Sequence, residues 1–232
     1  MFSERLAETL PAVRERISGA ARRAGREADS VRIVAVTKGH PVEVVDASLG
    51  AGLQDLAENR VEALQDRVPR FEGRECRWHM VGHLQRRKAP EVRGLVTLLH
   101  SLDSLKLARR LERTAAEADP VLPVLVQVNT SGEETKGGFT PENAVEGVGE
   151  LLEMGSLVPQ GLMTMAPYTD EESVLRETFR RLRSLNERLA RELDAYEGAE
   201  LSMGMSNDFE IAIEEGSTMV RLGTVLFGER GG

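Results

Sequence analysis

The chain alternates short β-rich runs with helical patterns along its whole length, and this alternation constrains its fold more than any other feature. Runs of apolar and β-branched residues recur eight times, each with the length of a buried strand. We expect strands at Arg32–Val36, Leu53–Ala57, Trp78–Val81, Thr97–His100, Val124–Val128, Val158–Met163, Leu201–Met203 and Met219–Leu222. Helical patterns lie between them near residues 42–50, 59–68, 84–93, 104–118, 141–153, 171–195 and 207–215, and an amphipathic helix precedes them near residues 4–25.

Strict alternation of this kind implies parallel strands joined by crossover helices. Eight such units in 232 residues favour a single (β/α)8 TIM barrel with an extra N-terminal helix over an open doubly wound sheet. An open sheet would also need a glycine-rich turn after its first strand, and the stretch from Val36 to Pro41 has none. No linker or internal repeat interrupts the pattern, so we expect one α/β domain over residues 1–232.

The net charge and the cysteine content limit the possible binding partners and the cellular compartment of the protein. A net charge of −8 disfavours nucleic acid and anionic membranes, which bind basic surfaces. The single cysteine, Cys76, excludes an internal disulfide and suits a reducing compartment. The N-terminus lacks a signal-peptide pattern, and no apolar run approaches the roughly 18 residues of a membrane helix. We therefore expect a cytoplasmic protein that binds neither nucleic acid nor membrane.

Lys38 stands at the end of the first expected strand in a chain that hardly uses lysine. Only four of its 30 basic residues are lysines, and the other 26 are arginines. Lysine, unlike arginine, can lose its proton and attack a carbonyl to form a Schiff base. A lysine-poor composition with Lys38 as an ordinary surface charge is the alternative explanation. Its position at the C-terminal end of a buried strand favours the chemical role.

In a (β/α)8 barrel the loops at the C-terminal ends of the strands form the functional site. The loops after the seventh and eighth strands often hold phosphate there, with help from a helix N-terminus. Residues 206–208 have the pattern of a helix N-cap. Gly204 allows a close backbone approach, and Arg221 could add charge-assisted hydrogen bonds. Each feature has an ordinary structural explanation, as a cap or an ion pair. A phosphate cradle and an amine at one barrel mouth together match pyridoxal 5'-phosphate (PLP), which carries a phosphate and an aldehyde.

Several motifs, in order along residues 5–229, resemble those of the pyridoxal phosphate homeostasis proteins, single-domain relatives of the alanine racemase barrel (PLP fold type III). They are Val34-Ala35-Val36-Thr37-Lys38, Glu58-Asn59-Arg60, Trp78-His79-Met80-Val81-Gly82-His83-Leu84-Gln85, Val128-Asn129-Thr130-Ser131, Gly161-Leu162-Met163-Thr164-Met165, Leu201-Ser202-Met203-Gly204-Met205-Ser206, Val220-Arg221-Leu222-Gly223-Thr224 and Phe227-Gly228. The serine–methionine loop and the block that begins at Trp78 are specific in combination.

The resemblance implies a cofactor and a set of residues that hold it. PLP would be bound as a covalent aldimine on Lys38. The phosphate would lie against Ser206, Arg221, Gly223 and Thr224. The ring would be surrounded by Asn59, His79, Met163 and Ser202. Two positions depart from the family pattern, with Ala57 in place of a glycine and Arg87 in place of an asparagine, and neither belongs to these sets.

Three functions remain open at this stage. The first is a PLP-binding protein that takes part in intracellular PLP (vitamin B6) homeostasis without dedicated catalysis, and it can include transfer of PLP to dependent apoenzymes. The second is a PLP-dependent amino-acid racemase, which needs a base on each face of the substrate adduct. The related racemases take one base from a tyrosine of a further C-terminal domain, and this chain ends at Gly232. The third is an aldolase that uses Lys38 without a cofactor. We expect the first, with no catalytic residue and no metal site.

Overall fold

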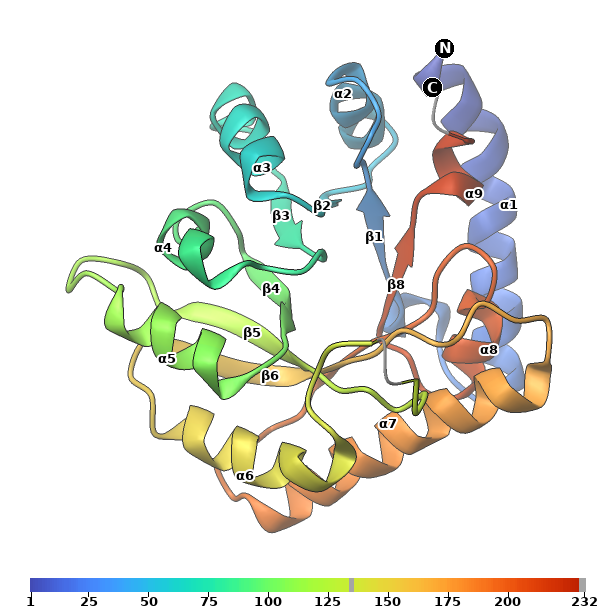
Figure 1. Cartoon of the computed structure of the whole chain (residues 1–232). Coiled ribbons are helices and arrows are strands. Elements are labelled where there is room, and N and C mark those ends of the chain that lie inside the picture. The colour runs from blue at the N-terminus through green and yellow to red at the C-terminus, as the bar shows by residue number, and fades with distance from the viewer. Residues whose placement is uncertain (134–135, 230–232) are drawn as a thin grey trace.

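The computed structural model describes residues 1–133 and 136–229, and in them eight parallel strands close into a barrel (Figure 1). Each strand pairs with the next along the chain, and β8 pairs with β1 to close the sheet. The strands are β1 (Arg32–Val36), β2 (Asp55–Glu58), β3 (Arg77–Met80), β4 (Leu98–Leu102), β5 (Leu122–Gln127), β6 (Leu157–Met163), β7 (Glu200–Ser202) and β8 (Met219–Leu222). The expected (β/α)8 barrel is confirmed. A single domain over residues 1–232 stays a prediction, and residues 134–135 and 230–232 lie outside the described part.

Helices surround the barrel, as the alternation predicts. They are α1 (Phe2–Arg23), α2 (Glu43–Gly50), α3 (Val61–Arg67), α4 (Ala89–Val92), α5 (Leu105–Arg113), α6 (Pro141–Leu152), α7 (Glu172–Glu192), α8 (Phe209–Glu214) and α9 (Thr224–Phe227), with short 3₁₀ turns η1 (Ala28–Ser30), η2 (Val68–Phe71) and η3 (Arg86–Lys88). The extra N-terminal helix α1 packs against α2, α8 and α9 (Figure 1). Its buried positions, among them Leu6, Leu10, Val13 and Ile17, recur at helical spacing and form the contact face.

Some boundaries differ from the sequence-based prediction for identifiable reasons. Strand β4 continues to Leu102, beyond the expected end at His100, because both His100 and Ser101 are buried and hydrogen-bonded. The helix expected at 104–118 ends at Arg113, and the hydroxyl of the next residue, Thr114, donates back to a carbonyl of the last turn. The helical pattern at 84–93 forms only the short η3 and α4. Helix α9 was not expected.

The inside of the barrel contains both an apolar core and a polar layer. Alternate residues of a strand face the same side, and the inward apolar side chains form a cluster separate from the larger core between strands and helices. This inner cluster comprises Val34, Val36, Ala57, Leu98, Leu125, Met163 and Met219. Polar side chains of the strands are also buried, among them His79, His100, Ser202 and Arg221. The barrel interior therefore holds hydrogen-bonding groups that must find partners on other strands.

We expect Gly161→Ala to destabilise the barrel strongly. Gly161 on β6 faces Glu200 on β7, and a Cβ at this position would lie 1.8 Å from the carbonyl oxygen of Glu200. Because the obstacle is backbone, the strands would have to move apart, at a cost of roughly 3 kcal/mol or more in the free energy of unfolding measured by urea denaturation. In the control Gly149→Ala, within α6, the new methyl group meets nothing within 4 Å. Because alanine favours the helix more than glycine does, this variant should raise the free energy of unfolding by about 0.5–1 kcal/mol. Equal stabilities for the two variants would contradict the β6–β7 packing.

Candidate functional site

The carboxyl ends of the strands enclose a cavity of about 280 Å³ at the mouth of the barrel. The residues that line it are Val36, Lys38, His40, Val81, Met165, Tyr168, Met205, Ser206, Asn207, Arg221, Gly223 and Thr224. Five of the residues that the sequence singled out are among them: Lys38, Ser206, Arg221, Gly223 and Thr224. The end of β1 and the loops after β7 and β8 therefore meet at one cavity, as the sequence led us to expect of a barrel.

The other four expected residues lie close by but elsewhere. Asn59 lines a neighbouring cavity of about 530 Å³ that also reaches Lys38. His79 and Ser202 are buried in the polar layer inside the barrel, and Met163 belongs to the inner apolar cluster. In the described structure, these three side chains are part of the barrel interior rather than of the cavity lining.

The loop that carries Lys38 is held on both sides by one arginine. Arg67, the last residue of α3, is buried and donates hydrogen bonds to the carbonyl oxygens of Thr37 (3.3 Å) and His40 (2.5 Å). These two carbonyls flank Lys38 in the sequence. The guanidinium group thus fixes the backbone from which the lysine side chain extends.

Arg67 is in turn anchored by a buried carboxylate. Glu58, the last residue of β2, accepts hydrogen bonds from Arg67 and from the hydroxyl of Thr37, each at 2.6 Å. Burial raises the pKa of Glu58, while the Thr37 hydrogen bond and the positive charges of Arg67 and Lys38 act in the opposite direction. A carboxylate, a guanidinium and the lysine loop therefore form one connected unit beside the cavity.

Across the cavity, Ser206 joins the loops after β7 and β8. Its hydroxyl accepts a hydrogen bond from the amide of Val225 in α9 at 3.3 Å. The first amides of a helix have no acceptor within the helix and point toward ligands or solvent. Gly223 precedes α9, and a Cβ there would lie 3.2 Å from the carbonyl oxygen of Val36, so a larger residue would crowd the end of β1.

The expected N-cap at residues 206–208 is present at Asp208, but the side chain does not cap α8. The carboxylate instead accepts from the amide of Met205 at 2.5 Å and so closes the loop after β7 on itself. Gly204, with φ +95°, begins this loop, and a Cβ there would lie 2.7 Å from the Cβ of Ala212. Gly204 therefore allows the loop to pack closely against α8, and the expected approach of its backbone to a bound phosphate stays a prediction.

Arg221 contributes a buried positive charge to the cavity wall. Its guanidinium donates to the carbonyl oxygen and the hydroxyl of Ser202, both at 2.7 Å, and to the carbonyl oxygen of Thr164 at 2.8 Å. Burial lowers the pKa of Arg221 to about 10, and the negative charge of Asp208 opposes this shift. Within residues 1–133 and 136–229, no carboxylate lies within ion-pair distance of this guanidinium. A buried cation with neutral partners, together with hydroxyls and helix amides, suits a ligand that carries an anionic group.

The sequence analysis did not identify the buried residues that hold the site residues in place. Arg67 lies in a helix among 26 arginines, and nothing local marks it as buried. Asp55 and His100 are buried hydrogen-bonding residues of β2 and β4, and the ring of His100 contacts that of His79 at 5.0 Å between centroids. The available signal was a polar residue within or next to an apolar strand, which is uncommon unless it is paired.

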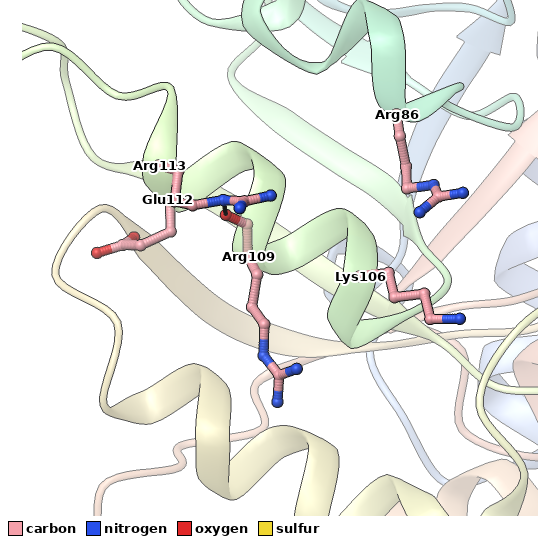
Figure 2. Close-up of a pocket in the computed structure, with 5 residues that line it drawn as sticks. All are labelled: Arg86, Lys106, Arg109, Glu112 and Arg113. Atoms are coloured by element: carbon pink, nitrogen blue, oxygen red, sulfur yellow. Dashed lines mark hydrogen bonds between the residues drawn. The ribbon is translucent and has the colours of Figure 1, made fainter.

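A third cavity, of about 420 Å³, lies outside the barrel between η3 and α5 (Figure 2). It is lined by Arg86, Lys106, Arg109, Glu112 and Arg113. Figure 2 shows these side chains along α5 and at η3, with one hydrogen bond from Arg113 to the carbonyl of Arg109. No residue predicted from the sequence to belong to the site lines it.

The part of the chain that the structure describes lacks two kinds of feature. It contains no group of three or more His, Cys, Asp or Glu side chains that could hold a metal ion. No helix in it has the length and apolar character needed to cross a membrane.

Comparisons with known proteins agree with this geometry. Residues 9–231 match the family model described as alanine racemase, N-terminal domain. A pyridoxal phosphate homeostasis protein of Aquifex aeolicus is 42% identical over 223 residues, which cover 96% of this chain and 97% of the relative. The structure of PipY of Synechococcus elongatus with PLP bound has a TM-score of 0.84 at 29% identity and covers 98% of this chain and 100% of its own. Alanine racemase of Clostridium difficile (TM-score 0.79, 19% identity, 99% of this chain and 58% of the racemase) shares the fold.

We expect Arg67→Lys to loosen the loop that carries Lys38. A lysine keeps the charge beside Glu58 but cannot donate to two carbonyls at once in a fixed fork. The free energy of unfolding should fall by about 2 kcal/mol, and the backbone amides of residues 37–40 should exchange with deuterium faster. The control Arg70→Lys changes an exposed pair with Asp66 and should alter stability by less than about 0.5 kcal/mol. Unchanged exchange at residues 37–40 in Arg67→Lys would contradict this role of Arg67.

Proposed function

The chain belongs to the alanine racemase N-terminal domain family and, within it, to the pyridoxal phosphate homeostasis proteins, and from this premise we propose that it binds PLP at the mouth of its barrel. Its role is in intracellular PLP (vitamin B6) homeostasis, without dedicated catalysis. The observation that carries the proposal is that Lys38 and the loops after β7 and β8 line one cavity. A phosphate and an aldehyde on one small ligand could engage both sides at once.

The cavity offers a suitable partner for each reactive part of PLP. The phosphate would be held by Ser206, Gly223 and Thr224, whose hydroxyls and amides border α9. Arg221 adds the buried positive charge. PLP supplies an aldehyde, and the amine of Lys38 would hold it as a Schiff base. The Arg67–Glu58 unit supports this step because it fixes the backbone on both sides of the lysine.

The remaining expected residues would act from the walls of the site. Asn59 would approach the ring from the neighbouring cavity that it shares with Lys38. Met163 would support the ring from the inner apolar cluster. Ser202 would act through Arg221, to which it is hydrogen-bonded, and His79 from the polar layer behind Ser202.

A carrier role is better supported than the alternative, a PLP-dependent amino-acid racemase. Racemisation needs an ordered base on each face of the substrate adduct. Tyr168 borders the cavity, but 94% of its surface is exposed, so packing does not hold it in one position. The other tyrosine, Tyr196, is buried and donates its hydroxyl to Asn186. The curated relatives are named homeostasis proteins, and their names describe no racemase reaction.

The aldolase reading has less support than either PLP role. The family includes relatives that bind PLP, such as PipY, whereas no feature described above indicates a phosphorylated sugar as the ligand. We further propose that the recipients of the bound PLP are PLP-dependent apoenzymes of the cytoplasm. The lysine at the mouth, rather than deep in the barrel, makes such release physically reasonable.

We expect Lys38→Ala to abolish covalent attachment of PLP. Wild-type protein mixed with PLP should show the visible absorbance of a Schiff base, and borohydride reduction should leave the adduct on the peptide that contains Lys38. Lys38→Ala should lose the adduct completely while keeping its circular dichroism spectrum, because the lysine side chain is only partly buried. The matched control is Lys106→Ala on α5, which lines the cavity between η3 and α5 rather than the one at the barrel mouth and should keep the adduct.

Two results would count against the proposal. A reducible adduct that persists in Lys38→Ala would contradict the assignment of the lysine. A wild-type protein that gains neither colour nor adduct with added PLP would contradict PLP binding itself. A separate amino-acid racemase assay on the wild-type protein distinguishes the carrier from the racemase.

A further inference from the structure

A continuous line of hydrogen bonds crosses the inside of the barrel and ends at the cavity. Asp55 on β2 lies 3.0 Å from His79 Nε2 on β3, and His79 Nδ1 lies 2.8 Å from His100 Nε2 on β4. His100 Nδ1 lies 2.8 Å from the hydroxyl of Ser202 on β7, and that hydroxyl accepts from Arg221 on β8 at 2.7 Å. All five side chains are buried.

The two ends of this line lie at opposite ends of the barrel. Asp55 is the first residue of β2 and is paired with Arg77, the first residue of β3, whose side chain is 46% exposed. Arg221 stands near the carboxyl end of β8 and lines the cavity. Because all strands run in the same direction, the line connects the amino-terminal face of the barrel with its mouth.

The hydrogen bonds in this line have a single consistent direction. Asp55 is a carboxylate that only accepts, so Nε2 of His79 must carry a proton and donate it. Nδ1 of a neutral His79 is then an acceptor, and Nε2 of His100 must donate to it. This leaves Nδ1 of His100 as the acceptor of the Ser202 hydroxyl proton, and frees the oxygen lone pairs of Ser202 for the guanidinium of Arg221.

The reverse direction would leave a buried hydroxyl proton without a partner. If His79 were doubly protonated, His100 would donate to Ser202, whose oxygen already accepts from Arg221. The Ser202 hydroxyl would then need another acceptor, and the described residues provide none. Such an unsatisfied buried group is costly.

The charges at the two ends and the neutral centre agree with this direction. Burial alone would raise the pKa of Asp55, but hydrogen bonds from Arg77 and His79 outweigh it, and the pKa lies below its ordinary value. Burial lowers the pKa of His100 well below its ordinary value, and the positive charge of Arg221 acts in the same sense. A neutral His100 thus lies between an anion at one end of the line and a cation at the other.

We propose that Asp55, His79, His100 and Ser202 form a hydrogen-bond relay of fixed direction that positions Arg221. Through this relay, the charge of Asp55 at the amino-terminal face of the barrel controls how tightly the cavity holds its anionic ligand. The four are positioning residues. The carboxylate fixes the proton position in His79, His79 fixes it in His100, and His100 fixes the hydroxyl of Ser202 so that its lone pair faces Arg221. Without the charge, each of these groups can turn, and the guanidinium loses an acceptor that holds its orientation. The identity of the ligand rests on the proposed function, whereas the existence of the relay does not.

The direction of the relay is tested first, on the wild-type protein without added PLP. Long-range ¹H–¹⁵N spectra separate the two neutral tautomers of histidine from the doubly protonated form. The chain has four histidines, and the single substitutions His40→Gln, His83→Gln, His79→Gln and His100→Gln assign their signals. His79 and His100 should both carry their proton on Nε2. A proton on Nδ1 of His100, or a doubly protonated His79, would overturn the relay.

The coupling to the cavity is tested with Asp55→Asn, which keeps the shape of the side chain and removes its charge. The Kd for PLP should rise roughly tenfold, and the His100 signal should become a mixture of tautomers. The matched control Asp46→Asn also neutralises an aspartate paired with an arginine, Arg74, but on the surface, and should leave the Kd within about twofold of wild type. If Asp55→Asn unfolds, His79→Gln interrupts the relay while leaving the Arg77–Asp55 pair, and the same rise in Kd is expected.

The outcomes separate this inference from the proposed function. A folded Asp55→Asn, or His79→Gln in its place, with wild-type Kd would overturn the coupling even though PLP binds. A wild-type protein that does not bind PLP would overturn the proposed function. In that case the tautomers of His79 and His100 still decide whether the relay exists, and inorganic phosphate replaces PLP in the comparison of Asp55→Asn with Asp46→Asn. Equal phosphate affinity in these two variants would then overturn the coupling.

Discussion

The pairing of β1 with β8 joins the first strand of the chain to the last, and the candidate site depends on it. In this ladder Arg32 lies beside Met219 and Ala35 beside Leu222. Because the two strands are parallel and end at the same mouth, Lys38, just after β1, and Gly223, just after β8, line one cavity. Helix α1 packs against α8 and α9 on the outside of this region (Figure 1). If the sheet remained open, the lysine and the loops around α9 would lie at opposite edges and could not hold one small ligand.

The second constraint is the satisfaction of charge inside the barrel. Removing an ion from water costs several kcal/mol, and the cost is recovered only with partners in good geometry. Arg67 meets this condition with Glu58 and two loop carbonyls, and Asp55 meets it with Arg77 and His79. Arg221 has hydrogen-bond partners, but among the residues seen in the structure it has no carboxylate at ion-pair distance. An anionic ligand would supply the missing negative charge. The need of buried charges for partners therefore accounts both for the polar interior of the barrel and for the proposed binding of an anion.

The fold was largely predictable because each strand of a closed barrel is buried on both faces and forms an apolar run. Errors arose where a polar residue enters the barrel. The expected strand at Leu53–Ala57 is observed at Asp55–Glu58, and β4 continues past His100, since a buried polar side chain resembles the end of a strand. The support of the lysine loop by Arg67 was not predictable, because its partners are carbonyls of a distant loop. In a chain with so many arginines, no local pattern distinguishes the buried one.

By itself, the sequence determined the order of strands and helices, and hence that Lys38, Ser206, Arg221, Gly223 and Thr224 follow or end strands that meet at one mouth. These properties are local, because apolar periodicity and turn residues encode them within a few positions. Only the tertiary structure decided which of these side chains face the cavity and which of the polar residues form its wall. His100 and Ser202 are hydrogen-bonded although 102 residues separate them. Such a contact depends on the register of a whole closed sheet, and the register is set by the packing of all eight strands together.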